Sequence, residues 1–128
     1  DGPAVFADPD LFGRVLLNLI ANALKYSPGG KPVTVGADSD SRGVRVWVRD
    51  CGPGIAHENR DRVFAKFGVV PHREGLSLPS SGLGLAFCKL AVEAQGGEIG
   101  FNNLAGGGCR FWCLLPAAQV ERPGAGAL

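Results

Sequence analysis

The sequence predicts a two-layer α/β sandwich, in which helices cover one face of a β-sheet and leave the other face more open. Helical patterns occur in three segments, and five shorter segments have the composition of strands. Their order is strand, helix, two strands, helix, loop, helix, two strands, so most strands are joined as hairpins. This order argues against a Rossmann-type domain, whose strands alternate with helices. We expect a mixed sheet of about five strands with about three helices on one face.

The first predicted helix covers residues 9–26 and follows a short strand at residues 3–7. Asp8 offers an acidic cap, and Pro9 takes the first helical position, where its missing N–H costs nothing. The turn sequence SPGG at residues 27–30 ends the helix. Apolar residues recur along it at helical spacing, namely Leu11, Val15, Leu16, Leu19, Ile20, Ala23 and Leu24.

A β-hairpin is predicted next, because the β-rich segments 32–38 and 44–50 are joined by the polar turn 39–43. Alternate residues of a strand point to opposite faces of the sheet. The second strand should therefore place one set of residues on each face. Val44, Val46 and Val48 form one set, and Arg45, Trp47 and Arg49 form the other.

The second half of the chain predicts a short helix at residues 58–66 and a longer one at 83–95, the latter ended by Gly96-Gly97. Between them, residues 68–81 have no consistent period, and we expect a loop that is not ordered without a ligand. The last two segments, residues 97–103 and 109–116, predict strands. We expect one domain over residues 1–116 and a disordered tail over 117–128.

The composition limits the classes of protein that fit. A chain of 128 residues is long enough for one core, and a net charge of +1 gives no reason to expect nucleic acid as a partner. No apolar run approaches the roughly 20 residues that span a bilayer. The chain does not begin with Met, so we expect a piece of a longer protein that carries any membrane anchor elsewhere. The isolated piece should be monomeric.

Four cysteines are present, but their spacing fits neither a disulfide framework nor a zinc site. Cys51 and Cys88 stand alone, and Cys109 and Cys113 lie four apart within a predicted strand. We therefore expect reduced thiols, as in a cytoplasmic protein.

One face of the first helix carries the first candidate site. Asn18 and Asn22 are four residues apart, and Lys25 with Tyr26 continues the same face at the next turn. For the two asparagines alone, a solvated polar face is the simpler interpretation.

Two glycine-containing segments are the other candidates. In DCGPGI, Asp50 ends a strand and spaced glycines allow a flat ligand to approach the backbone closely, although a plain turn would look the same. In SGLGL, residues 81–85, glycines open a helix and expose backbone N–H groups at its positive end. That pattern alone is weak, and the absence of GK[ST] excludes a P-loop enzyme.

Together and in this order, these segments resemble the ATP-binding catalytic domain of sensor histidine kinases. The stretch DPDLFGRVLLNLIANALKYS is similar to their asparagine box, and DCGPGI to their first glycine box. VFAKF is similar to their phenylalanine box, and SSGLGLAFCKLAVEAQGGEI to their second glycine box. GGGCRFWCLLP looks like their last strand, so the resemblance covers about residues 1–116.

The resemblance implies a Bergerat-type fold and an ATP site with Mg²⁺. Asn22 would coordinate Mg²⁺, Lys25 would pair with phosphate, and Tyr26 would pack beside the nucleotide. Asp50 would accept a hydrogen bond from the amino group of adenine. The residues implied to surround the nucleotide further are Gly52, Gly54, Ile55, Ser81, Gly82, Leu83, Gly84 and Leu85; Phe64 and Phe67 would either anchor the lid or belong to the core.

Asn18 separates the kinases from related ATPases. In gyrase, MutL and the ninety-kilodalton heat-shock chaperone, the residue four before the metal-binding Asn is a Glu that acts as general base on water. An amide cannot take a proton at neutral pH. The resemblance therefore implies a histidine kinase whose catalytic residues are Asn18, Asn22 and Lys25.

Two departures from the family pattern leave alternatives open. Phe67-Gly68-Val69 replaces the usual aromatic and Arg after the phenylalanine box, and Arg73 is the nearest substitute. No phosphoacceptor box, a His followed by an acidic residue on a dimerising helix, is present. His57-Glu58 matches it superficially, but this pair lies just after the first glycine box, where a helix start is expected. A separate dimerisation domain would then supply the histidine, and a response regulator would receive the phosphate. The alternatives are a nucleotide-binding regulatory module without kinase activity and a serine kinase of the anti-sigma-factor type.

Overall fold

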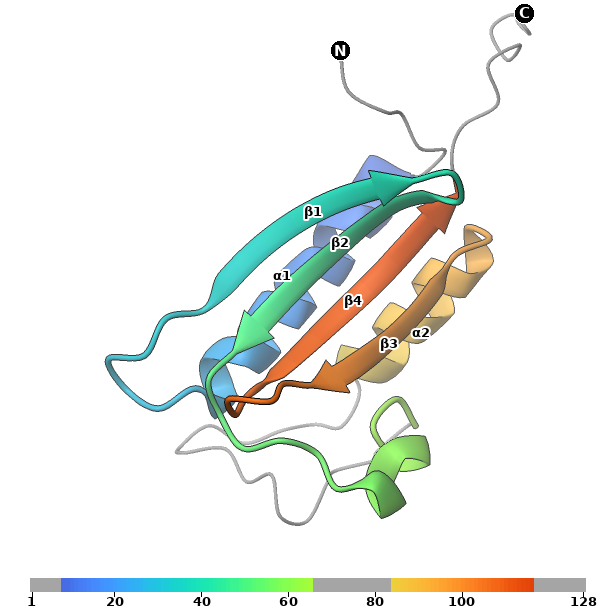
Figure 1. Cartoon of the computed structure of the whole chain (residues 1–128). Helices are drawn as coiled ribbons and strands as arrows, with labels where there is room; N and C mark the ends of the chain where they lie inside the picture. Colours follow the sequence, from blue (N-terminus) through green and yellow to red (C-terminus); the bar gives the residue numbers. More distant parts are fainter. Residues whose placement is uncertain (1–7, 66–83, 117–128) are drawn as a thin grey trace, which may run out of the picture.

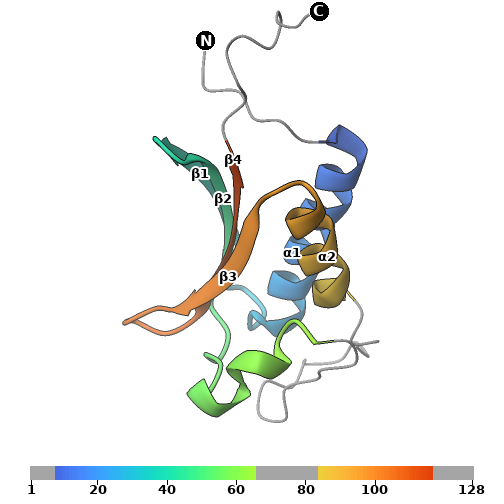
Figure 2. The same ribbon diagram turned by 90° about the vertical axis from the view of Figure 1, so that its right-hand side faces the viewer.

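The structure, a computed structural model, describes residues 8–65 and 84–116. Figure 1 shows a curved sheet with α1 (Pro9–Tyr26) and α2 (Gly84–Ala94) side by side behind it. The view in Figure 2 separates the sheet and the helices into two layers. The predicted two-layer α/β sandwich is confirmed. The strand predicted at residues 3–7, the loop at 68–81 and the tail at 117–128 lie outside the described residues.

The sheet contains four described strands in the order β1-β2-β4-β3. Each neighbouring pair is antiparallel, and each strand was predicted from the sequence. The fifth expected strand is the one at residues 3–7. The strands are β1 (Thr34–Asp40), β2 (Gly43–Asp50), β3 (Glu98–Asn103) and β4 (Cys109–Pro116).

The turn between β1 and β2 is shorter than the sequence predicted. Asp40 pairs with Gly43, so only two residues connect the strands instead of five. The backbone N–H of Arg42 donates to the Asp40 carboxylate at 2.8 Å, which closes the turn with a side-chain acceptor. Such local Asp–backbone bonds replace a backbone turn.

Helix α1 begins and ends where the sequence predicted. The Asp8 carboxylate accepts hydrogen bonds from the backbone N–H groups of Asp10 and Leu11, at 2.9 and 3.2 Å. These two bonds satisfy donors that an α-helix leaves free at its start. No helix in the described part of the chain is long and apolar enough to cross a membrane.

The short helix expected at residues 58–66 is instead a 3-10 helix, η1 (His57–Arg62). Its residues are polar and none is buried, so there is no apolar face to hold a longer helix. The apolar Val63 and Phe64 follow it and pack against the core.

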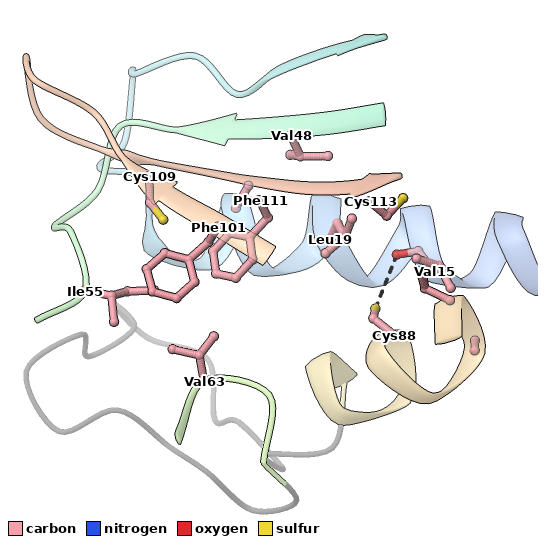
Figure 3. Close-up of a cluster of buried hydrophobic side chains, with 13 residues drawn as sticks. Val15, Leu19, Val48, Ile55, Val63, Cys88, Phe101, Cys109, Phe111 and Cys113 are labelled. Carbon is pink, nitrogen blue, oxygen red and sulfur yellow. Dashed lines mark hydrogen bonds between the residues drawn. The ribbon is translucent and has the colours of Figure 1, made fainter. Parts of the chain in front are cut away.

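The core lies between the helices and the inner face of the sheet, as Figure 3 shows. Phe111 is its largest fully buried side chain, and the rings of Phe101 and Phe64 lie 5.7 and 6.0 Å from it. The thiol of Cys88 donates to the backbone carbonyl of Val15 at 3.6 Å (Figure 3). All four cysteines are free thiols, as predicted.

The outer face of the sheet has no helix of the described chain against it and is covered by its own side chains. Trp47 and Trp112 are direct neighbours across β2 and β4. The Arg45 guanidinium lies 4.9 Å from the Trp112 ring centroid, and that of Arg110 lies 5.5 Å from Trp47. These cation–π contacts shield both indole rings from water.

Candidate functional site

The amide of Asn18 lies where α1 meets the start of α2. Its Nδ2 donates to the backbone carbonyl of Arg14 at 2.9 Å, one turn earlier in the helix. A Cβ added to Gly84 would lie 2.8 Å from the Asn18 Oδ1 atom. A side chain at the first position of α2 would therefore have to displace the Asn18 amide. The first and third candidate segments are therefore in contact.

The amide of Asn22, one turn further along α1, is not satisfied by the described part of the protein. Its Nδ2 atom is buried and has no hydrogen-bond partner there. A buried polar group without a partner costs about 1–3 kcal/mol. Three other described side-chain atoms share this state, namely Arg45 Nε, Trp47 Nε1 and Arg110 Nε on the outer face of the sheet, and Asn22 Nδ2 is the one on the helix face that carries the candidate site.

Lys25 continues the same face of α1 and is half-buried. Its Nζ atom lies 5.5 Å from the centroid of the Tyr26 ring. Loss of hydration by burial lowers the pKa of the Lys25 ammonium below its ordinary value. An anion beside this ammonium would favour the charged form.

Asp50 is fully buried at the end of β2, with 0% of its surface exposed. Its Oδ1 atom accepts hydrogen bonds from the backbone N–H groups of Gly52 at 2.9 Å and Cys109 at 3.2 Å. Gly108 has a φ of +90°, and a Cβ there would lie 2.2 Å from the Asp50 carbonyl oxygen. The start of β4 can therefore approach Asp50 only because residue 108 is a glycine.

The loop after β2 is tied to the end of α1. The backbone N–H of Cys51 donates to the Ser27 hydroxyl at 2.9 Å, and Ser27 is buried. A Cβ on Gly52 would lie 2.2 Å from the carbonyl oxygen of Tyr26. The first and second candidate segments are thus packed backbone against backbone.

The other end of this loop is tied to β3. Asn103 bonds to both backbone groups of Ile55: its Oδ1 accepts from the N–H at 2.9 Å and its Nδ2 donates to the C=O at 2.8 Å. The Ile55 side chain is 3% exposed and joins the core cluster. Gly54 lies against the same amide, since a Cβ there would be 2.8 Å from Asn103 Oδ1.

The remaining predicted site residues divide into two groups. Leu85 and Phe64 are half-buried and pack against the core cluster, which fits the core interpretation of Phe64. The other group lies outside the described residues and consists of Phe67, Ser81, Gly82 and Leu83.

Three residues that hold the site were not predicted for it. Gly108 belongs to the run at residues 106–108, which was placed with the last strand and given no role in the site. Ser27 ends the asparagine-box stretch and Asn103 lies in a predicted strand, but neither was assigned a role in the site. Their hydrogen bonds join residues 24 and 48 positions apart in the chain, which no local pattern indicates.

A separate cavity of about 530 Å³ lies between η1, α2 and the edge strand β3. Of the residues singled out for the site, its lining contains only Phe64. Its lining includes Arg60, Phe64, Lys89, Ile99, Phe101 and Trp112.

Comparison with known proteins identifies the family of the chain. Residues 7–119 match the family described as histidine kinase-, DNA gyrase B- and HSP90-like ATPase. The sensor protein KdpD of Rathayibacter rathayi is 42% identical over 123 residues, which cover 94% of this chain and 14% of that protein. The adaptive-response sensory kinase SasA of Nostoc sp. (strain PCC 7120) is 34% identical over 117 residues, 91% of this chain and 29% of that protein.

Solved structures of the same kind share the fold. The mycobacterial sensor histidine kinase MprB superimposes with a TM-score of 0.79 at 33% identity, covering 91% of this chain and 78% of that one. Full-length ShkA in complex with AMPPNP has a TM-score of 0.70 at 35% identity, covering 93% of this chain and 24% of that one. The chain spans only 14% and 29% of the lengths of KdpD and SasA, the two curated relatives named above. The chain belongs to the histidine kinase-, DNA gyrase B- and HSP90-like ATPase family, and it is an ATP-binding catalytic domain of the sensor histidine kinase kind.

Proposed function

We propose that this domain binds ATP with Mg²⁺ and transfers the γ-phosphoryl group to a histidine on a separate dimerisation domain. The observation that carries the proposal is the buried, unpartnered amide of Asn22. It lies on the same helix face as Asn18, which touches the start of α2, and Tyr26, which touches the glycine loop after β2. A ligand oxygen that accepts from Asn22 Nδ2, such as a phosphate oxygen, would satisfy this donor and leave Oδ1 to face a metal ion.

Asp50 is the residue proposed to recognise adenine. Its carboxylate is buried and oriented by two backbone N–H donors, so its position is fixed before a ligand arrives. A buried carboxylate accepts a hydrogen bond from the exocyclic amine of adenine, whereas guanine presents an oxygen at that position. Gly52, Gly54 and the backbone at Ile55 would leave room for the base beside it.

Asn22 fits one ligand position of a magnesium ion. An amide oxygen is a suitable hard ligand, and Mg²⁺ commonly takes one or two protein oxygens with water and phosphate as the rest. The described residues contain no cluster of three or more His, Cys, Asp or Glu side chains that would form an all-protein site. When bound, Mg²⁺ would neutralise charge on the phosphates.

The phosphates would lie between Lys25 and the start of α2. The Lys25 ammonium would pair with phosphate oxygens. The backbone N–H groups of Gly82, Leu83 and Gly84 would add donors at the positive end of the helix, with Ser81 and Leu85 flanking them. Tyr26 would pack beside the nucleotide, and Phe67 would hold the near end of the lid.

Asn18 favours transfer over hydrolysis. Its amide donates to the Arg14 carbonyl and cannot take a proton from water at neutral pH. Hydrolysis would then be slow, and the γ-phosphoryl group would be transferred to a better nucleophile than water. The acceptor imidazole forms the new N–P bond as the bond to the β-phosphate oxygen breaks, and the imidazole proton passes to an acidic neighbour on the acceptor domain. ADP is released, and a response regulator would receive the phosphoryl group.

A phosphotransfer assay tests the proposal. The chain is mixed with the histidine-bearing dimerisation domain of its parent protein and with radiolabelled ATP and Mg²⁺. We expect a labelled acceptor whose phosphate is lost in acid and kept in base. An acid-stable label would instead identify a serine kinase, and nucleotide binding without any label would identify a regulatory module. Release of phosphate without the acceptor would contradict the role given to Asn18.

A further inference from the structure

The β3–β4 hairpin forms hydrogen bonds to both ends of the loop after β2. Asn103 and Cys109 are the pair of residues that closes the β3–β4 ladder before the hairpin turn. From this pair, the Cys109 N–H donates to the Asp50 carboxylate at 3.2 Å. The Asn103 amide makes two hydrogen bonds to the backbone of Ile55, at 2.9 and 2.8 Å. The segment between Asp50 and Ile55 is thereby held from the same side of the molecule.

The bond between Asn103 and Ile55 fixes an orientation as well as a distance. A side-chain amide has an acceptor and a donor in one plane, and here both are used on the backbone of a single residue. The Ile55 side chain is anchored separately in the core, beside Phe101 and Val63 in Figure 3. The amide and the core together leave the backbone at Ile55 no freedom to rotate.

Fixing this point matters because the loop contains two glycines. Gly52 and Gly54 allow many backbone conformations when nothing constrains them. The Asp50 carboxylate depends on the loop, since one of its donors is the N–H of Gly52. A loop that is ordered before binding gives tighter and more selective recognition than a loop that must be ordered by the ligand.

We propose that Asn103 is a positioning residue for adenine selection: its amide holds the glycine loop so that the Asp50 carboxylate faces the base. The inference rests on the proposed role of Asp50. Asn103 itself does not touch the nucleotide in this account and acts through Ile55 and the loop.

The first test measures binding of ATP and of GTP to the whole chain by calorimetry, with Mg²⁺ present. For Asn103→Ala we expect ATP affinity to fall about tenfold, the scale set by one or two lost hydrogen bonds. GTP affinity should change by less than about twofold, because guanine does not use the Asp50 carboxylate as an acceptor for an amine. The ATP-to-GTP ratio should therefore shrink. An unchanged ratio would overturn the inference.

Asn102→Ala is the matched control. Asn102 is an exposed asparagine at the neighbouring position of β3 and points to the opposite face of the sheet. Its side chain makes no hydrogen bond to the part of the chain that the structure describes. This variant should keep the wild-type ratio. Failure of the wild-type chain to bind either nucleotide would overturn the proposed function and the inference with it, whereas an unchanged ratio in Asn103→Ala overturns the inference alone.

Asn103→Asp provides a second readout that does not depend on overall stability. A protonated carboxyl group matches the amide, with its O–H donating to the Ile55 carbonyl and its C=O accepting from the Ile55 N–H. The ionised group has no donor, and its negative charge would be repelled by the partial negative charge on the Ile55 carbonyl oxygen. Relative to wild type, the ATP affinity and the ATP-to-GTP ratio of this variant should both fall as the pH rises from about 4 to 7. Parallel pH profiles for the variant and wild type would contradict the positioning role.

Discussion

The carbonyl oxygen of Tyr26 lies where a side chain at position 52 would begin. A Cβ built on Gly52 would be 2.2 Å from that oxygen, well inside the contact distance of two atoms. The end of α1 and the loop after β2 can therefore pack only because residue 52 is a glycine. Since α1 carries Asn22 and the loop follows Asp50, this contact sets the distance between the two proposed halves of the nucleotide site.

Gly52→Ala should lower both stability and nucleotide affinity. The added methyl group must push α1 and the loop apart, and overpacking of this kind costs about 1–3 kcal/mol. Chemical denaturation gives the change in the free energy of unfolding, and calorimetry gives the affinity for ATP. Gly29→Ala is the control, because a Cβ there meets no atom within 4 Å. Equal behaviour of the two variants would contradict the packing argument.

Asp50→Asn should change base selection more than stability. The amide oxygen can still accept from the backbone N–H groups of Gly52 and Cys109, but the amide nitrogen cannot accept from the adenine amine. ATP affinity should fall about 10- to 100-fold, the range for a hydrogen bond to a charged group. Competition binding with ATP, ITP and GTP measures the selectivity. Retention of the wild-type preference for adenine would remove Asp50 from that role.

Asn22→Ala should weaken ATP binding only when Mg²⁺ is present. The expected loss is about tenfold or more, the scale on which metal sites respond to changes in their ligand shell. Calorimetric titrations in Mg²⁺ and in excess EDTA should separate the two conditions. Asn22→Asp keeps an oxygen ligand and should retain the Mg²⁺ dependence. An equal loss with and without the ion would show that Asn22 acts otherwise.

Lys25 should make ATP affinity depend on pH in the alkaline range. Burial lowers the pKa of its ammonium, so the group loses its proton at a lower pH than an ordinary lysine. ATP affinity should therefore begin to decline at that lower pH. The sign for stability is opposite: the unfolded chain binds this proton more tightly, so the free domain gains stability as pH rises past the lowered pKa.

Lys25→Arg separates these effects, because a guanidinium stays charged throughout the range. Its ATP affinity should stay level where that of wild type declines. Fluorescence titrations from about pH 7 to 10 would check this, since they span the neutral range and the ordinary titration of lysine. A declining arginine variant would exclude Lys25 as the titrating group.

The cysteines should differ sharply in reactivity. Burial raises the pKa of Cys88 to about 12 and, with a smaller opposing backbone hydrogen bond, that of Cys113 to about 11, so both stay as unreactive thiols at neutral pH. Cys109 is fully buried, whereas Cys51 is partly exposed. Iodoacetamide labelling followed by mass spectrometry should modify Cys51 first, and the other three only after denaturation. Early labelling of Cys88 would contradict the packing of α2 on α1.

Much of the architecture follows from local patterns in the sequence. Helix α1 begins at Pro9 and ends at Tyr26 as predicted, because its cap, its apolar spacing and its terminating turn all lie within a few residues. The alternation in β2 likewise separated two faces of the sheet, and the valine face is the inner one, where Val48 is buried. By contrast, the segment predicted as a helix at residues 58–66 forms a 3-10 helix. Tertiary contacts hold only Val63 and Phe64 against the core, and no residue of the polar η1 is buried.

The sequence by itself determined the family, the strand and helix order and the residue types that a nucleotide and a metal ion require. Only the tertiary structure decided how those residues are held. The contact of Asn18 with Gly84, the bond from Cys109 to Asp50 and the paired bonds between Asn103 and Ile55 each join distant parts of the chain. Local propensity acts over a few residues, whereas these approaches depend on how helices and strands pack, and that is fixed only once the whole core has formed.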